Sequence, residues 1–292
     1  MGVRRALCVS DDPGVRRDVG DALAGAGYTV ETCDALPPDC GAAVLVVVDR
    51  AARQAAGQRL CGMQAPVVVV GDNLDDEALF SLMAEAPVSH LVEDPRDRDL
   101  GITSQKLASG DLFGLEKYLA PGARVDERVV ASDGDRRAAI GEIGAWAEAT
   151  GARRPVVHRL ANVVDELLMN ALFDAPTADT AARDRRAVLR FGRDERALAV
   201  SVTDLFGSLS QRDVIDNIRR ARVERGRPQA ETATQRGAGL GLYFILANVA
   251  SLIVNIDPGR RTEVVCLFDL VRRDLRPAIP RGVRSLHVFA QT

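Results

Sequence analysis

Short hydrophobic runs separated by polar turns dominate the first hundred residues of the chain. The runs at 42–48 and 65–70 are rich in valine, a pattern typical of strands buried on both faces of a parallel sheet. The opening segment alternates an apolar run, an acidic turn, an amphipathic stretch and a second run, and residues 88–94 supply a fifth strand. Residues 1–100 are therefore predicted to form a doubly wound, five-stranded α/β domain.

The pattern changes after this first domain. Residues 101–122 are polar and helical in parts, and Pro121 and Gly122 close them, so we expect a helical connector. Beyond it come a strand, a helix at about 135–150 and an apolar helix at 156–173 with a period near 3.6. Alternating strands, a glycine-rich turn, a further helix and two strands follow. Residues 123–292 are predicted to be a second α/β domain that ends in a strand extension.

Composition narrows the classes of protein to which the chain can belong. A length of 292 residues fits two domains, and a net charge of −3 gives no reason to expect nucleic acid as a partner. The start of the chain lacks the apolar core of a signal peptide, and no apolar run is long enough to span a membrane. Five cysteines without a CxxC pair fit reduced thiols. We expect a cytoplasmic protein that is not associated with a membrane.

A cluster of three glycines marks the candidate chemistry of the second domain. Gly237, Gly239 and Gly241 form a GxGxG pattern that follows polar residues, so the spacing and context of a dinucleotide-binding loop are both missing. No lysine follows them, which excludes a Walker loop. A glycine-rich helix N-terminus can still bind an anion through its free amides. Close packing of helices at Gly241 is the alternative.

Polar residues on two other predicted elements suit a nucleotide. Glu166 and Asn170 are four positions apart on an otherwise apolar helix, so they share one face. Their oxygens are of the kind that Mg²⁺ prefers. Asp204 ends a predicted strand, where its carboxylate could accept a hydrogen bond from an exocyclic amine. Taken singly, each of these residues could equally be a solvated or capping side chain.

As an ordered set, these segments resemble the GHKL ATPase superfamily, over about residues 123–270. The resemblance implies a two-layer α/β sandwich of the Bergerat type with ATP and Mg²⁺ as cofactors. In it, "DELLMNA" is similar to the N box, in which Asn170 holds Mg²⁺ and Glu166 is the catalytic base. The nucleotide contacts that the resemblance implies are Asn170, Asp174, Asp204 on the adenine amine, Phe206, Gly207, Gly237, Ala238, Gly239, Leu240, Gly241, Leu242 and Thr262.

The chain departs from the superfamily pattern at two of these positions. Phe206 replaces the first glycine of the usual DxGxG, so Gly207 comes one place late. Asp174 stands where many members have a cation that faces phosphate, a reversal that could impair transfer or hydrolysis. Arginines in the region of the nucleotide lid are either a substitute for that cation or a solvated helix face. They are Arg212, Arg219, Arg220 and Arg236.

The branch of the superfamily follows from what precedes the N box. None of the three histidines lies on a dimerising hairpin, so autophosphorylation of the histidine-kinase type is not expected. The segment 124–151 resembles the opening of the anti-sigma-factor serine kinases, which act on a partner in trans. The resemblance implies a bacterial signalling protein that binds ATP and acts in trans on a regulatory protein, either as an ATP-dependent kinase or as an anti-sigma-like regulator that sequesters it. A non-catalytic nucleotide- or protein-binding scaffold and a slow conformational ATPase remain alternatives.

The first domain resembles a response-regulator receiver. Asp11 and Asp12 match its Mg²⁺-binding turn, and Asp49 falls where the phosphoacceptor would be. Gly71 stands in place of the switch hydroxyl, and Asp94 in place of the lysine. A carboxylate there leaves the pocket without a fixed cation. We therefore expect a pseudo-receiver used for docking or dimerisation, with a homodimer left open.

Overall fold

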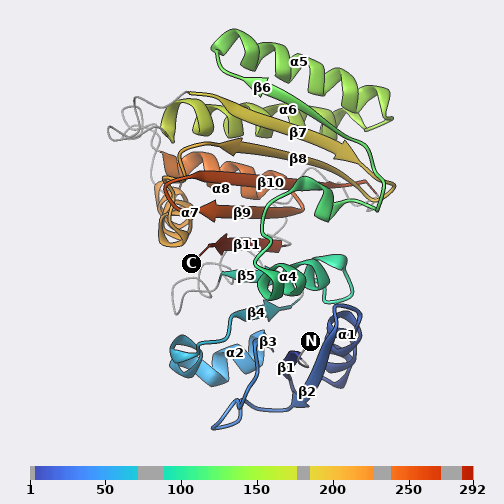
Figure 1. Ribbon diagram of the computed structural model, residues 1–292, viewed down its shortest axis with the longest axis vertical. Helices are drawn as coiled ribbons and strands as arrows, with labels where there is room; N and C mark the ends of the chain where they lie inside the picture. Colours follow the sequence, from blue (N-terminus) through green and yellow to red (C-terminus); the bar gives the residue numbers. More distant parts are fainter. Residues whose placement is uncertain (1–3, 72–88, 176–184, 226–237, 271–284, 292) are drawn as a thin grey trace. The chain divides into compact units, whose positions relative to one another are not determined.

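The chain folds into two compact units of mixed α/β structure. The computed structural model describes residues 4–71, 89–175, 185–225, 238–270 and 285–291, and the side chains of 61–62 and 220–240 lie outside that description (Figure 1). Unit 1 comprises residues 1–112 and 282–287, and unit 2 comprises 113–281 and 288–292. The expected connector, 101–122, is thus divided between the two units. Among the described helices, none has the length and apolarity needed to cross a membrane.

Unit 1 contains the five predicted strands in the order β2-β1-β3-β4-β5, and every one of these pairs is parallel. The strands are β1 (Arg4–Val9), β2 (Tyr28–Cys33), β3 (Leu45–Asp49), β4 (Val67–Val70) and β5 (His90–Val92). The tail was expected as a strand of the second domain. It does form a strand, β11 (Ser285–Ala290), but its first three residues belong to unit 1 and pair antiparallel with β5. That pairing satisfies backbone groups at the edge of β5.

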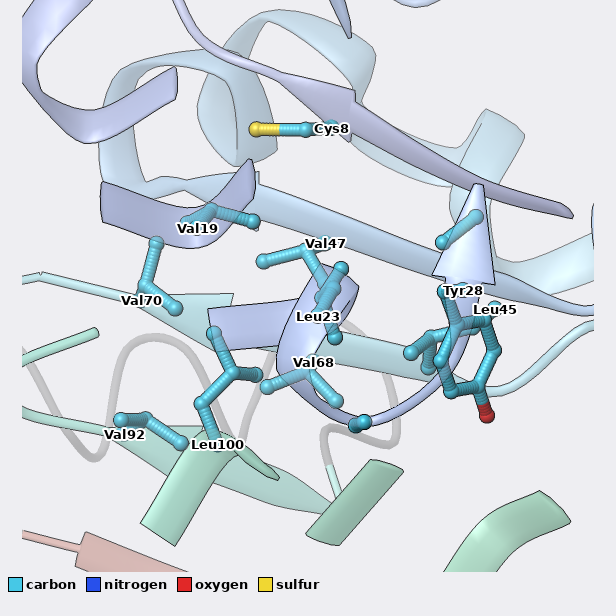
Figure 2. Packing of buried hydrophobic residues seen from close by; sticks show 12 residues of the cluster. Cys8, Val19, Leu23, Tyr28, Leu45, Val47, Val68, Val70, Val92 and Leu100 are labelled. Carbon is cyan, nitrogen blue, oxygen red and sulfur yellow. The ribbon is translucent and has the colours of Figure 1, made fainter. Parts of the chain in front are cut away.

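Both faces of the unit 1 sheet are buried, as its valine-rich strands predict. On one face, Leu45 and Val47 pack with Leu23 of α1 (Pro13–Gly25) and Leu100 of α4 (Arg98–Ser109), as Figure 2 shows. On the other face, the intervening residues Val46 and Val48 are also fully buried. The helix α2 (Arg50–Ala56) lies on that side and leads into the short helix η1 (Gly57–Gly62).

Unit 2 is built on an antiparallel sheet in the order β9-β10-β8-β7-β6. The predicted strands are confirmed as β6 (Val125–Val130), β7 (Ala187–Arg193), β8 (Ala197–Asp204), β9 (Ser251–Asp257) and β10 (Arg261–Asp269). The helices are α5 (Asp133–Ala149), α6 (Arg154–Met169), α7 (Gln211–Arg225) and α8 (Ala238–Asn248). Helix α6 packs on β8 and β10, and α8 packs on β9 and on α6.

Helix α6 and the segment around the short helix η2 (Leu115–Tyr118) both contact the unit 2 sheet. Helix α6 buries its apolar side against one face, including Leu160, Val163 and Leu167. The segment around η2 contacts β7 and β8, and just before it Gly114 donates its backbone N–H to Glu263 Oε2 over 3.0 Å. Because residues alternate along β10, Glu263 faces away from its neighbour Thr262, which leaves Thr262 on the α6 side.

Candidate functional site

A cavity lies in unit 2 between the sheet and helices α6, α7 and α8. Its volume is about 70 Å³, enough for several water molecules. Its wall combines apolar side chains with carboxylate, amide and hydroxyl groups, the mixture expected of a ligand site. The lining residues are Leu167, Asn170, Ala171, Asp174, Ala175, Val202, Asp204, Ser208, Leu209, Asn217, Leu242, Thr262 and Val264.

The spacing of the lining residues follows from the elements that carry them. Val202 and Asp204 are two apart on β8, so both point to the same face of the sheet. Thr262 and Val264 repeat this spacing on the neighbouring strand β10, where Thr262 is the register partner of Asp204. Opposite the strands, Leu167, Asn170, Ala171 and Asp174 follow helical spacing from the last turn of α6 onward.

Asn170 lies where the regular helix α6 gives way to the wider turn η3 (Asn170–Asp174). Its backbone carbonyl accepts a hydrogen bond from Ala175 N at 2.7 Å, five residues further on, which is the pattern of a π-turn. The side-chain Oδ1 is buried and has no hydrogen-bond partner among the described residues. A buried amide oxygen without a donor costs about 1–3 kcal/mol. The structure thus shows a buried acceptor without a partner among the described residues, on a residue that lines the cavity.

Asp204 presents a buried carboxylate at the end of β8. Its Oδ1 accepts hydrogen bonds from the backbone N–H groups of Phe206, at 2.8 Å, and Gly207, at 3.1 Å. Burial raises the pKa of Asp204 above its ordinary value, and the two backbone hydrogen bonds act in the opposite direction. The carboxylate is thus fixed in orientation by the turn that follows it, beside Thr262.

Phe206 and Gly207, both expected to contact nucleotide, do not line the cavity. Phe206 is buried. Gly207 has φ +59°, and a Cβ atom added there would lie 2.6 Å from Arg260 N and 2.8 Å from Arg261 N. Its carbonyl also accepts a hydrogen bond from Gly259 N at 3.0 Å. The close approach to the turn between β9 and β10 explains why glycine is required at this position.

Glu166 lies one helical turn before Asn170, and its carboxylate rests against Gly241 of α8. A Cβ atom at Gly241 would lie 2.9 Å from Glu166 Cδ, so the glycine makes room for the side chain. Burial raises the pKa of Glu166, and the nearby charges of Asp174 and Asp165 raise it further. Glu166 does not itself line the cavity, although Asp174 does. Burial also raises the pKa of Asp174.

The glycine box is only partly described by the structure. Gly237 lies outside the described residues. Helix α8 begins at Ala238, and the side chains of Ala238 to Leu240 lie outside the description. Leu242, one turn further along, lines the cavity. The described end of the expected phosphate loop, at Leu242, thus lies beside the cavity.

The lid arginines that are described pair with a carboxylate of their own helix. Arg212 Nε lies 3.5 Å from Asp216, and Arg219 Nη1 lies 3.7 Å from the same residue. Arg212 is largely exposed, as expected of a solvated helix face. The side chain of Arg220 and the whole of Arg236 lie outside the described residues. None of the described cavity-lining residues is an arginine or lysine.

Sequence reasoning did not assign eight of the described lining residues to the site: Leu167, Ala171, Ala175, Val202, Ser208, Leu209, Asn217 and Val264. Ser208 and Leu209 follow Gly207 directly, and Asn217 reaches the wall from α7. Asn217 is buried, which is unusual for an amide on a helix rich in charge. Its spacing from the buried Val214 and Ile218 was the available signal, because these positions lie on one helical face.

In unit 1, the acidic residues expected to form a receiver pocket act mainly as helix caps. Asp12 Oδ1 accepts a hydrogen bond from Gly14 N at 2.6 Å, and Asp49 Oδ1 accepts one from Ala52 N at 2.7 Å. The other carboxylate oxygen of Asp49 accepts a hydrogen bond from Ser10 Oγ. The described residues contain no group of three or more His, Cys, Asp or Glu side chains that could hold a metal ion, Asp11, Asp12 and Asp49 included.

The two substituted switch positions of unit 1 have other neighbours. A Cβ atom added at Gly71 would lie 3.2 Å from Arg50 Cγ and 3.3 Å from Cδ, so the stem of Arg50 occupies the space beside it. Asp94 accepts hydrogen bonds from the Arg96 guanidinium at 2.9 Å. The space beside Gly71 is thus filled by the Arg50 side chain, and the Asp94 carboxylate is paired with Arg96.

Comparison with known proteins finds a likeness among solved structures. No protein-family model matches the chain, and no curated protein matches it. Among solved structures, it is similar to a chain from the crystal structure of the SiaB–SiaC complex of Pseudomonas aeruginosa, with 17% sequence identity and a TM-score of 0.37. The likeness covers 49% of this chain and 88% of that one. The functional assignment therefore depends on the residues of the cavity.

Proposed function

We propose that unit 2 binds ATP with Mg²⁺ at the cavity between α6, α7, α8 and the sheet, whose volume of about 70 Å³ admits a part of the nucleotide and not the whole of it. One observation carries the proposal: a buried carboxylate, Asp204, and a buried amide oxygen, Asn170 Oδ1, which has no partner among the described residues, converge on the same apolar-walled cavity. Adenine offers an exocyclic amine to the carboxylate, and Mg²⁺ offers a positive charge to the amide oxygen. The order of these residues along the chain agrees with the GHKL resemblance.

The residues of the cavity suit the parts of such a ligand. Leu167, Val202 and Val264 supply an apolar surface for a flat base, and Asp204 would accept its amine hydrogen. Asn170 would contribute to holding Mg²⁺, with water completing the coordination. When bound, ATP would supply a transferable phosphoryl group.

Glu166 is the residue proposed to move a proton. Its raised pKa brings it closer to neutral pH, where a general base works best. It lies one turn from Asn170 on the same face of α6 but does not line the cavity, so a partner hydroxyl would have to pass Asn170 to reach it. By resemblance, the acceptor is a hydroxyl on a regulatory protein, which makes the chain an ATP-dependent protein kinase acting in trans.

A second function, nucleotide binding without turnover, is favoured by Asp174. This carboxylate lines the cavity and, by resemblance, stands where many members have a cation that faces phosphate; the described lining residues include no basic side chain. Such a protein would act as a nucleotide-dependent scaffold. Measurement of ADP formation in the presence and absence of a partner separates the two functions.

Unit 1 is proposed to be a receiver-like docking domain. The parallel order β2-β1-β3-β4-β5 is that of the flavodoxin-like, doubly wound folds to which receivers belong. Gly71 and Asp94 replace the groups that would bind and sense a phosphoryl group, and Asp49 is engaged by Ser10 and Ala52. A domain that keeps the fold but lacks these groups suits the binding of a regulatory protein or a second copy of the chain.

Isothermal titration calorimetry of the full chain with ATP and Mg²⁺ tests the proposal for unit 2. Saturable binding with one site per chain supports it. Absence of heat at ligand concentrations in the millimolar range, in a protein whose fold is verified by circular dichroism, contradicts it.

A further inference from the structure

Gly241 has an unusual environment for a glycine inside a helix. It is buried in α8, and the three atoms nearest to a Cβ atom built on it all belong to the side chain of Glu166. Cδ lies at 2.9 Å and Cγ at 3.2 Å, with the carboxylate oxygen Oε1 closer still. Real Cβ atoms do not approach other heavy atoms so closely.

The contact joins the two helices that frame the cavity. Helix α6 carries Glu166 and packs against α8, which carries Gly241. A side chain at position 241 would occupy the space that the carboxylate fills. Because the atoms in the way are the end of a flexible side chain, Glu166 would rotate away before either helix had to move.

Two described glycines of helix α5 lack this relationship. Gly141 and Gly144 in α5 have no heavy atom within 4 Å of an added Cβ. Glycine costs a helix interior about 1 kcal/mol relative to alanine. Glycine at the buried position 241 carries this cost. The space that it leaves for the Glu166 side chain, called here the seat of Glu166, accounts for it.

We propose that Gly241 is a positioning residue for Glu166: the missing side chain creates the space that holds the carboxylate between α6 and α8, one turn from Asn170. On this proposal, the last glycine of "GAGLG" serves the carboxylate and not a phosphate. The role of Glu166 as a general base rests on the proposed function, whereas the contact between its side chain and Gly241 does not.

The first test follows the titration of Glu166 by carbon-13 NMR of the full chain labelled at glutamate side chains, with Glu166→Gln to assign its signal. We expect Gly241→Ala to lower the pKa of Glu166, because the displaced carboxylate gains solvent and loses the burial that raises its pKa. Gly144→Ala, the matched control, leaves the titration unchanged. An unchanged titration in Gly241→Ala, or an equal change in Gly144→Ala, overturns the proposal.

A second measurement uses the length of the side chain. Aspartate is one methylene shorter, so in a Glu166→Asp background the methyl group that Gly241→Ala adds has less to displace. We expect Gly241→Ala to change the thermal unfolding temperature and ATP affinity less in that background than in wild type, a coupling between the two sites. Additive effects contradict the seat.

The outcomes distinguish this proposal from the proposed function. The titration requires no nucleotide. If Gly241→Ala shifts the pKa of Glu166 but the protein does not bind ATP, the positioning role of Gly241 stands and the proposed function is rejected. If the protein does transfer phosphate, Gly241→Ala should lower the rate by about 100-fold, the typical contribution of a general base. If Gly241→Ala shifts the pKa of Glu166 but leaves the rate of phosphoryl transfer unchanged, Glu166 is not the general base, although Gly241 still positions its side chain.

Discussion

Asp204 and Thr262 stand opposite each other in the antiparallel pairing of β8 and β10, and both buried side chains face the cavity. The pairing places a carboxylate and a hydroxyl at the apolar floor of the site. Because the backbone amides of Phe206 and Gly207 hold Asp204 Oδ1, the charge of the residue can be changed without loss of its acceptor atom.

Replacement of Asp204 by asparagine tests its role toward the base. The amide oxygen can still accept the two backbone hydrogen bonds, but the charged acceptor for an amine is lost. We expect ATP affinity to fall about 10- to 100-fold, the equivalent of one charge-assisted hydrogen bond. Calorimetry measures it, with Asp269→Asn at the other end of β10 as the control. Equal affinity in both variants contradicts the assignment.

The same variant should be more stable than wild type at neutral pH. Burial raises the pKa of Asp204 above its unfolded value, so the folded state binds its proton more tightly. The stability of wild type therefore falls as the pH rises through the folded pKa. The advantage of Asp204→Asn in thermal unfolding should be present at pH 7 and shrink on acidification. An advantage that grows toward acid pH contradicts the burial argument.

Asp174→Asn should lower the pKa of Glu166. After burial, the charge of Asp174 is the largest cause of the raised pKa, and its removal makes the ionised form of Glu166 less costly. The variant should also strengthen ATP binding if Asp174 faces the phosphates, as the GHKL resemblance implies, because one negative charge beside them is removed. Asp165→Asn is the matched comparison, and its effect should be smaller because Asp165 already pairs with Arg136. A larger change of the Glu166 pKa in Asp165→Asn than in Asp174→Asn would show that Asp174 is not the dominant charge beside Glu166.

Gly207 and Gly259 offer a test of close packing beneath the site. Both have positive φ, +59° and +71°, but only at Gly207 would a Cβ atom meet backbone. We expect Gly259→Ala to cost about 1–2 kcal/mol from the left-handed backbone alone. Gly207→Ala should cost clearly more and also weaken ATP binding, since the Asp204 turn must shift. Chemical denaturation measures both, and equal losses would exclude the clash.

Unit 1 should not hold a stable phosphoryl group. The carboxylate of Asp49 accepts hydrogen bonds from Ser10 Oγ and Ala52 N, and neither Gly71 nor Asp94 offers a hydroxyl or cation. We expect incubation with a small phosphodonor and Mg²⁺ to leave the intact mass unchanged. An added phosphate that is absent from Asp49→Asn would show that the domain is an active receiver.

The sequence predicts the elements, because they depend on local periodicity, and a part of the cavity. Asn170 was singled out by its spacing from Glu166, Asp204 by its place at the end of a strand, and Thr262 by the GHKL resemblance, and the structure brings these three to one cavity. The position of Asn217 depends on how α7 packs, which no local pattern fixes. The requirement for Gly207 comes from a turn about fifty residues away. Likewise, no pattern in the tail indicates that His287 pairs with His90 of β5.

The dependence of ATP affinity on Mg²⁺ in wild type and Asn170→Ala tests the central claim most directly. The control is Asn162→Ala, an exposed amide on the same helix. We predict that wild type and Asn162→Ala bind ATP more tightly with Mg²⁺ than without it, and that Asn170→Ala loses this gain, with affinity at least about tenfold lower. An Mg²⁺ gain in Asn170→Ala equal to that of wild type would contradict the account.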